Sequence, residues 1–351
     1  MVLDDPHAIT RIDAAGMLGL TQRLGAMVVE GWEAAADLAV PLECPAVIVT
    51  VGMGGSGIGG DLLRVLLAPT SPVPVVVVKD ERLPAFVGRQ TLVFACSYSG
   101  NTEETLAACA AAAAAGASIV AVTSGGRLAA QARAAGHPVV QIPGGLPPRA
   151  SLPYLLMPML DAAGHLGLTD IGQVDIDETA EVLADLAGRC GPAVPSADNP
   201  AKRLAAALRG AIPVIYAASP AMEPVAQRWK TQLNENGKVF AVWNTFPELT
   251  HNETVGWEGV TDGGPPLYAV VLRDRDDGAR AAVQVEVTRD LLLRRARGQA
   301  EIWSQGTGRL ARVFSLILFG DFVSSYLAVL EGVDPTPTAS IARMKQRLEG
   351  T

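Results

Sequence analysis

Residues 46–61 read AVIVTVGMGGSGIGGD, a β-branched apolar run that gives way to a glycine-rich turn. Three more apolar runs follow in the first half of the chain: VPVVVV (73–78), TLVFACS (91–97) and ASIVAV (117–122). Continuous apolar runs of this length are typical of strands that are covered on both faces. Between them the pattern predicts helices over about 57–68, 102–115 and 126–135. Strand–helix alternation with buried strands indicates a parallel sheet flanked by helices.

The same alternation continues in both directions along the chain. Residues 8–38 are expected to be helical. PGGLPPRASLP (143–153) is expected to form an ordered loop before two further helices, which end near 166 and 189. CGPAVPSADNP (190–200) has the composition of a linker and ends in Asn199–Pro200, a helix-start signal.

The second half repeats the scheme. Strands are expected at AIPVIYA (211–217), KVFAVW (238–243) and PLYAVVL (266–272), and helices over about 219–235, 308–331 and 338–349. The fold class is therefore α/β, with two doubly wound domains whose parallel sheets are flanked by helices. The predicted domains are residues 1–168 and 200–351, joined by a connection over 169–199.

Composition limits the classes of partner. Of 351 residues, 49% are hydrophobic and 18% charged, and the formal net charge is −8. An acidic balance argues against nucleic acid and anionic membranes as partners, because both require a basic surface. Cys44, Cys96, Cys109 and Cys190 form no CxxC pair, so we expect buried free thiols in a reducing compartment. MVLDDPHAIT has no apolar signal region, and the expected location is cytoplasmic.

The glycine turn after the first strand allows more than one interpretation. Glycines let backbone N–H groups approach an anion, and the positive end of the following helix points to the same place. Gly52, Gly54 and Gly57 also satisfy GxGxxG, which is found in dinucleotide-binding proteins. That alternative needs an acid after the second strand, where Asp80 is a poor candidate. A structural turn that binds no ligand is a third interpretation.

The turn after the third strand favours a phosphate. It reads CSYSGNTEET (96–105) and places the hydroxyls of Ser97, Ser99 and Thr102 at a second helix N-terminus. Hydroxyl and N–H donors suit a phosphate monoester, whereas ordinary N-capping would need Thr102 alone. In a parallel sheet, turns at the carboxyl ends of two strands face one crevice. We therefore expect one phosphate-binding pocket built from residues 52–61 and 97–105.

GMGGSGIGGDL together with SYSGNTEETL resembles the sugar isomerase (SIS) domain, and in particular the bifunctional phosphoglucose/phosphomannose isomerase family. NENGKVFAVWNTFPELTHNETVGW (234–257) and GVDPTPTASIARMK (332–345) are similar to that family's second-half and C-terminal motifs. The resemblance implies an isomerase that interconverts glucose 6-phosphate, and also mannose 6-phosphate, with fructose 6-phosphate. It also implies a homodimer with shared active sites.

That reaction moves a proton through a cis-enediol and needs no metal and no other cofactor. The resemblance assigns the proton-shuttling base to Glu235 and ring opening to His251, the latter contributed by the neighbouring subunit. It places Arg149 opposite the enediolate, Lys345 as a proton donor, and Thr338 where the mannose epimer needs room. It assigns phosphate binding to Gly55, Ser56, Ser97, Ser99 and Thr102. Gly237 departs from the serine expected after Asn236.

Two other classes of function stay open from the sequence: a non-catalytic sugar-phosphate sensor and a dinucleotide-dependent oxidoreductase that would use the GxGxxG turn. A non-catalytic sugar-phosphate sensor would use the same fold, although no basic helix-turn-helix accompanies it here. A metal-dependent mannose-phosphate isomerase would need clustered ligands, and the four histidines of the chain are dispersed.

Overall fold

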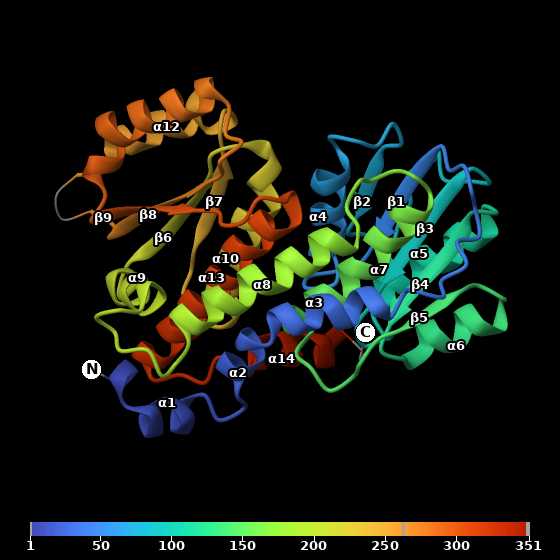
Figure 1. Ribbon diagram of the computed structural model, residues 1–351, viewed down its shortest axis with the longest axis horizontal. Helices are drawn as coiled ribbons and strands as arrows, with labels where there is room; N and C mark the ends of the chain where they lie inside the picture. The colour runs from blue at the N-terminus through green and yellow to red at the C-terminus, as the bar shows by residue number, and fades with distance from the viewer. Residues whose placement is uncertain (1, 262–263, 349–351) are drawn as a thin grey trace. The chain divides into compact units, whose positions relative to one another are not determined.

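The computed structural model describes residues 2–261 and 264–348. Contacts divide the chain into two compact units. The N-terminal unit comprises Arg23–Ala184 with Gln305–Ser315, and the C-terminal unit comprises Met1–Gln22, Asp185–Ser304 and Leu316–Thr351. Each unit contains one parallel sheet flanked by helices, which confirms the predicted α/β class (Figure 1).

The sheet of the N-terminal unit has five parallel strands in the order β2-β1-β3-β4-β5. The strands are β1 Val47–Val51, β2 Val75–Val78, β3 Thr91–Cys96, β4 Ser118–Thr123 and β5 Val139–Gln141. From β1 the chain first crosses to β2 on one side and then to β3 on the other. The direction of winding thus changes at β1, and ligands bind α/β sheets at the carboxyl ends of strands at such a switch point.

Helices cover both faces of this sheet. α5 (Glu103–Ala114) and α6 (Gly126–Ala134) bury alanines and leucines against one face. α4 (Ile58–Leu67) and α7 (Leu152–His165) cover the other face, and α3 (Leu24–Glu33) packs against α7. The α4 contact is close, since a Cβ on Gly60 would lie 2.1 Å from Thr50 Oγ1.

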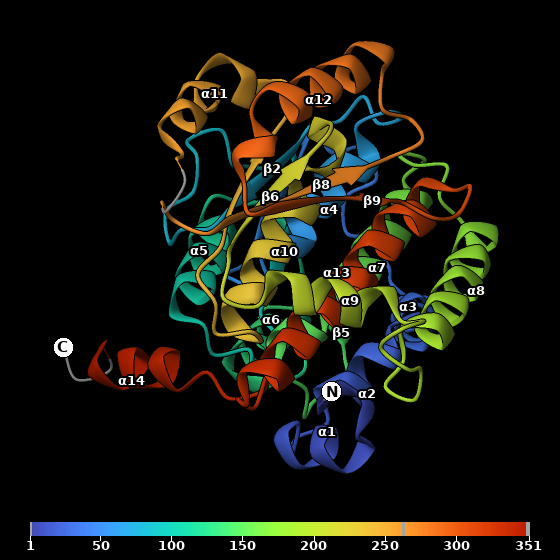
Figure 2. The same cartoon turned by 90° about the vertical axis from the view of Figure 1, so that its left-hand side faces the viewer.

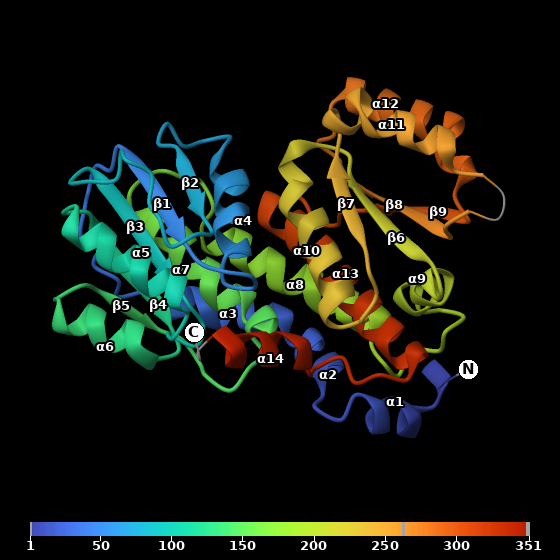
Figure 3. The ribbon, with the colours of Figure 1, turned by 180° about the vertical axis from the view of Figure 1, so that it is seen from behind.

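The C-terminal unit has four parallel strands in the order β7-β6-β8-β9. They are β6 Ile212–Ala217, β7 Val242–Thr245, β8 Leu267–Arg273 and β9 Gly298–Trp303. α10 (Glu223–Glu235) joins β6 to β7 and packs on both strands. α12 (Ala279–Leu291) joins β8 to β9, and Figures 2 and 3 show α12 beside α11 (Glu253–Gly256) at one end of the unit.

The predicted strand over 238–243 is wrong by several residues. Lys238 has a positive φ of 56°, and the N–H of Val239 returns to the carbonyl of Leu233, which ends α10. Asn234 Nδ2 also donates to Val239 O at 2.8 Å. These bonds hold Lys238 and Val239 at the helix end, and the strand begins only at Val242.

The elements β5, α12 and β9 were not predicted from the sequence. α12 contains VQVEV (283–287), and alternation with a period of two is typical of a strand, which obscures its helical pattern. The other predicted elements lie within a few residues of their positions in the structure, and Asn199 caps α9 (Pro200–Leu208) as expected. One cysteine differs from expectation, because Cys44 is exposed whereas the other three are buried.

The remaining helices are α1 Pro6–Ile12, α2 Met17–Gln22, α8 Gln173–Cys190, α13 Arg309–Glu331 and α14 Ala339–Leu348. Within the described residues, α13 alone is long and apolar enough to span a membrane. Of its most apolar window, 94% is buried inside the structure, as in the core helix of a soluble protein.

Candidate active site

The turn after β1 requires glycine because the backbone folds closely on itself. A Cβ on Gly57 would lie 2.6 Å from the carbonyl oxygen of Gly52, and one on Gly52 would lie 2.9 Å from that of Cys96. Gly54 has a positive φ of 53°. Helix α4 begins at Ile58, directly after the turn. Its N-terminus therefore directs the positive end of its dipole to this loop, and the N–H groups of Ile58 and Gly60 bond the carbonyls of Gly54 and Gly57 within the turn.

The turn after β3 places two hydroxyls together. Ser97 Oγ lies 3.0 Å from Thr102 Oγ1 and also accepts from the N–H of Gly100 at 3.1 Å. Thr102 is the N-cap residue of α5, yet its side chain makes no capping hydrogen bond. The N-capping interpretation of Thr102 is therefore wrong for its side chain, which is directed to Ser97.

Ser56 joins the two turns. Its hydroxyl accepts from the backbone N–H of Tyr98 at 3.1 Å, and its side chain is buried. Tyr98 OH in turn accepts from the N–H of Leu146 at 2.7 Å. Burial raises the pKa of Tyr98, so this phenol stays neutral and holds the loop before Arg149.

Arg149 belongs to the same wall of the N-terminal unit. It lies in the short helix Pro148–Ala150 and is 4% exposed. A Cβ on Gly55 would lie 3.0 Å from the backbone nitrogen of Arg149, so the glycine turn and the arginine loop touch. The structure thus brings Gly55, Ser56, Ser97, Thr102 and Arg149 together.

We call this group of five residues the cradle. Ser99, which was also predicted to belong to it, differs from its other hydroxyl residues. It is exposed, and its hydroxyl accepts from the N–H of Asn101 at 3.2 Å. Lys79, which follows β2, pairs with Asp61 of α4, and its Cε would lie 3.4 Å from a Cβ on Gly57. This cation beside the glycine turn was not predicted from the sequence. Lys79 could have been found from its place in the sequence, because it directly follows β2, the strand that pairs with β1.

Glu235 is the last residue of α10, and a buried polar seam fixes this helix. Arg228 and Gln232 both donate to the carboxylate of Asp321 on α13, at 2.7 and 2.8 Å. Asn236 donates to Ser324 of the same helix at 3.0 Å. The spacing of four residues along α10 puts all three donors on one face. The base candidate therefore lies at a rigid helix end.

Lys238 ties this helix end to the C-terminal loop. Its ammonium donates to the carbonyl oxygens of Pro335 at 3.0 Å, of Pro337 at 2.7 Å, and of Glu235. Thr338 directly follows Pro337 and precedes α14, which carries Lys345 on an exposed surface. The structure thus places Glu235 and the segment before Thr338 side by side. Sequence reasoning did not identify Lys238.

His251 ends the short helix Glu248–His251 that follows β7, and it is exposed. The loop around it is fixed through Glu253, whose carboxylate accepts from Tyr216 and Asn244. Trp257 Nε1 donates to the same Tyr216 hydroxyl at 2.8 Å. Burial is the main cause that raises the pKa of Tyr216, so the phenol acts as a neutral donor.

Glu235 and His251 lie at opposite edges of the second sheet. α10 runs from the carboxyl end of β6 back to the amino end of β7, so Glu235 lies at the amino edge. His251 follows the carboxyl end of β7. The 13 residues of α10 span about 20 Å at 1.5 Å per residue. One chain therefore does not bring these two side chains together.

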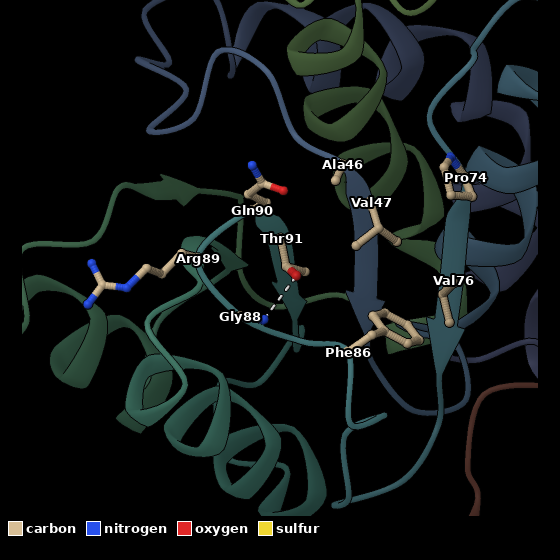
Figure 4. Close-up of a pocket in the computed structure, with 9 residues that line it drawn as sticks. All are labelled: Ala46, Val47, Pro74, Val76, Phe86, Gly88, Arg89, Gln90 and Thr91. Atoms are coloured by element: carbon tan, nitrogen blue, oxygen red, sulfur yellow. Dashed lines mark hydrogen bonds between the residues drawn. The ribbon is translucent and has the colours of Figure 1, made fainter.

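An apolar cavity lies away from this cradle. It has a volume of about 670 Å³ and opens at the amino ends of β1, β2 and β3 (Figure 4). Phe86 lies over Val47 and Val76 in its wall. The cradle is at the carboxyl ends of the same strands, so the cavity is no part of it. Among the described residues, no group of three His, Cys, Asp or Glu side chains could hold a metal ion.

Comparisons with known proteins agree with this geometry. Residues 42–140 match the SIS domain family, and residues 197–348 match the family described as bacterial phospho-glucose isomerase C-terminal SIS domain. The crystal structure of a glucose-6-phosphate isomerase like protein from Thermus thermophilus shares the fold. Its TM-score is 0.63 at 24% identity, and the match covers 98% of each chain.

Two relatives carry the same name, bifunctional phosphoglucose/phosphomannose isomerase. The protein from Caldicellulosiruptor bescii is 45% identical over 86% of this chain and 89% of that relative. The one from Aquifex aeolicus is 36% identical over 92% of this chain and 97% of that relative. At this identity over most of both chains, the protein belongs to the bifunctional phosphoglucose/phosphomannose isomerase family.

Proposed function

We propose that this protein interconverts glucose 6-phosphate and mannose 6-phosphate with fructose 6-phosphate. The observation that carries the proposal is the cradle of the N-terminal unit, where the hydroxyls of Ser97 and Thr102 meet at a helix N-terminus near the glycine turn. Such a site suits the doubly charged phosphate that all three sugars share. Gly55, Ser56 and Ser99 complete the phosphate site in this proposal.

The carbonyl shift is a proton transfer. Glu235 removes the proton from C2 of the open aldose and returns it to C1. The reaction passes through a cis-enediol between these two steps. Arg149 stabilises the charge that develops on the enediol oxygens. His251 and Lys345 open the ring by moving protons at the ring oxygen and the anomeric hydroxyl. No electrons enter or leave the sugar, so the proposed reaction requires no redox cofactor. Side chains carry every proton transfer and stabilise the enediol charge in this proposal, which therefore requires no metal.

Thr338 leaves room for either configuration at C2 in this proposal, and its position supports that role. The segment before it is tied by Lys238 to the helix that carries Glu235. In this division of labour, residues 1–168 bind the phosphate and residues 200–351 supply the proton transfers. The acidic net charge of −8 supports an enzyme that binds neither nucleic acid nor anionic membranes. We propose a cytoplasmic location for it.

Replacement of Glu235 by glutamine tests the base. With fructose 6-phosphate as substrate and EDTA present, the native enzyme should form both aldoses. Glu235→Gln should lose turnover by at least about a thousandfold and still bind the sugar phosphate. Full turnover in this variant would refute the assignment, and loss of native activity in EDTA would refute the metal-free mechanism.

We also propose a homodimer in which each site takes His251 from the second copy, because one chain keeps Glu235 and His251 at opposite edges of a sheet. Mixing two inactive variants tests this. A Glu235→Gln chain and a His251→Ala chain form mixed dimers with one intact site, so a 1:1 mixture should recover about a quarter of native activity. A mixture that stays inactive would refute the shared site.

A further inference from the structure

Helix α14 has an apolar face that no part of the described structure covers. Ile341 is 44% exposed and Met344 65% exposed, and residues 341–347 are all exposed. Lys345 borders this face one residue after Met344. Figure 2 shows α14 extending away from the rest of the C-terminal unit. An exposed amphipathic helix of this kind is suited to pack into an apolar groove.

A matching groove lies along α12 of the C-terminal unit. Val283, Val287 and Leu291 recur every four residues and are 57%, 49% and 56% exposed. They line a cavity of about 340 Å³ whose opposite wall contains Thr250 and Thr254. Those two threonines flank His251 in sequence. The groove is therefore part of the segment that presents the histidine.

Part of the charge beside the α12 groove is opposite in sign to that of α14. α14 carries Arg343, Lys345 and Arg347, all exposed. The C-terminal half of α12 exposes Glu286 and Asp290, and its Arg289 is paired with Glu301, while Arg280 and Arg294 are exposed near the two ends of the helix. Complementary charge favours one docking partner over others and accelerates encounter.

The groove of a chain is out of reach of its own α14. In all three ribbon views, α12 lies at one end of the C-terminal unit and α14 lies at the other, and Figures 2 and 3 show α11 beside α12. Lys238 holds the segment before α14 to the end of α10 through the carbonyls of Pro335 and Pro337. The helix that fills the groove must then come from elsewhere.

We propose that α14 of one protomer docks in the α12 groove of a second copy of this chain. The proposal rests on the shared active site of the proposed function. For His251 of one copy to reach Glu235 of the other, the α11–α12 end must approach the amino edge of the second sheet. α14 begins at that edge, so the contact that completes the site also brings the two apolar surfaces together. A two-fold dimer makes this contact twice.

A mixed disulfide tests the contact directly. Chains with Met344→Cys are mixed with chains with Val287→Cys, both in a Cys44→Ser background, because Cys44 is exposed. Mild oxidation should give a covalent dimer from the mixture, and neither variant alone should give one. A mixture in which no cross-link forms overturns the proposal.

Dimer affinity provides a second test that does not depend on oxidation. Val287→Asp and Met344→Asp should each raise the dissociation constant of the dimer by about tenfold or more in sedimentation. Combining Val287→Lys in one chain with Met344→Asp in the other should restore part of the affinity. Val174→Asp is the matched control, since Val174 is 81% exposed on α8 and should leave affinity unchanged.

The two levels of the proposal fail separately. If the Glu235→Gln and His251→Ala mixture recovers activity while Val287→Asp and Met344→Asp keep native affinity, the shared site stands and the docking is wrong. If the mixture stays inactive, the shared site of the proposed function is itself wrong. Loss of affinity in only one of the two aspartate variants also overturns the pairing of these surfaces.

Discussion

Asp321 is the residue through which α13 fixes the helix of the proposed base. Its two carboxylate oxygens accept from Arg228 at 2.7 Å and from Gln232 at 2.8 Å. The side chains of Arg228 and Asp321 are only 2% and 7% exposed, so the ion pair is shielded from water. Asp321→Asn keeps the shape of the side chain and removes its charge.

The expected loss of stability follows from that burial. Removing one partner of a buried ion pair costs about 3–5 kcal/mol, because the remaining charge keeps its desolvation penalty. The isosteric amide can still accept one hydrogen bond, so we expect the lower value. For a unit of about 150–250 residues, about 3 kcal/mol corresponds to a midpoint lower by about 6–12 °C.

Thermal unfolding of the native protein and the variant, followed by calorimetry, measures this shift. Asp185→Asn is the control, because Asp185 pairs with Arg189 in the same unit but both side chains are about half exposed or more. An exposed pair contributes under about 1 kcal/mol, so that variant should unfold near the native midpoint. Equal midpoints for Asp321→Asn and Asp185→Asn would refute the argument from burial.

Three further predictions concern other parts of the chain. Lys238→Met should lower turnover by about tenfold and change the ratio of glucose 6-phosphate to mannose 6-phosphate formed, because one ammonium holds three carbonyls. Lys238→Arg should restore part of the turnover. An unchanged product ratio in Lys238→Met would contradict this prediction. Burial raises the folded-state pKa of Asp161 above 3.8, so its contribution to stability is lost as pH rises through that pKa. Asp161→Asn should therefore raise the unfolding midpoint at pH 7, and the gain should vanish below pH 3.8. Gly100→Ala should lower the free energy of unfolding, measured in urea, by about 2 kcal/mol or more. The φ of Gly100 is 68°, and a Cβ there would lie 1.8 Å from Gly125 O. Gly164→Ala is the control and should be tolerated.

The fold of the N-terminal unit was predictable because several signals agreed there. Uninterrupted apolar runs, glycine turns and alanine-rich helices all indicated one buried parallel sheet. The second half carries a conflict between local pattern and tertiary contact. VQVEV in α12 alternates like a strand, but Val285 points to the core while Val283 and Val287 are exposed. Apolar residues therefore occupy both faces of α12. The exposed ones line a groove together with Thr250 and Thr254, and this groove is visible only in the folded structure.

The cradle residues could be predicted because backbone rules place them. A turn after a parallel strand must lie at the carboxyl edge, so Ser56 and Ser97 had to be neighbours. Contacts between side chains are different. Lys238 binds carbonyls almost a hundred residues away, and Asp321 lies on a helix whose sequence shows only a long apolar run. Contacts between residues so far apart in the chain have no characteristic sequence spacing, so a single sequence does not predict them.

The separation of Glu235 from His251 is a second long-range result that follows from chain connectivity alone. The two residues are near each other in sequence, which suggests one loop acting on one substrate. A helix between two parallel strands must run against them, however, so its last residue and the residues after the next strand lie at opposite edges of the sheet. Assigning both residues to one reaction is therefore already an argument for a second copy of the chain, and it is made before any interface is known.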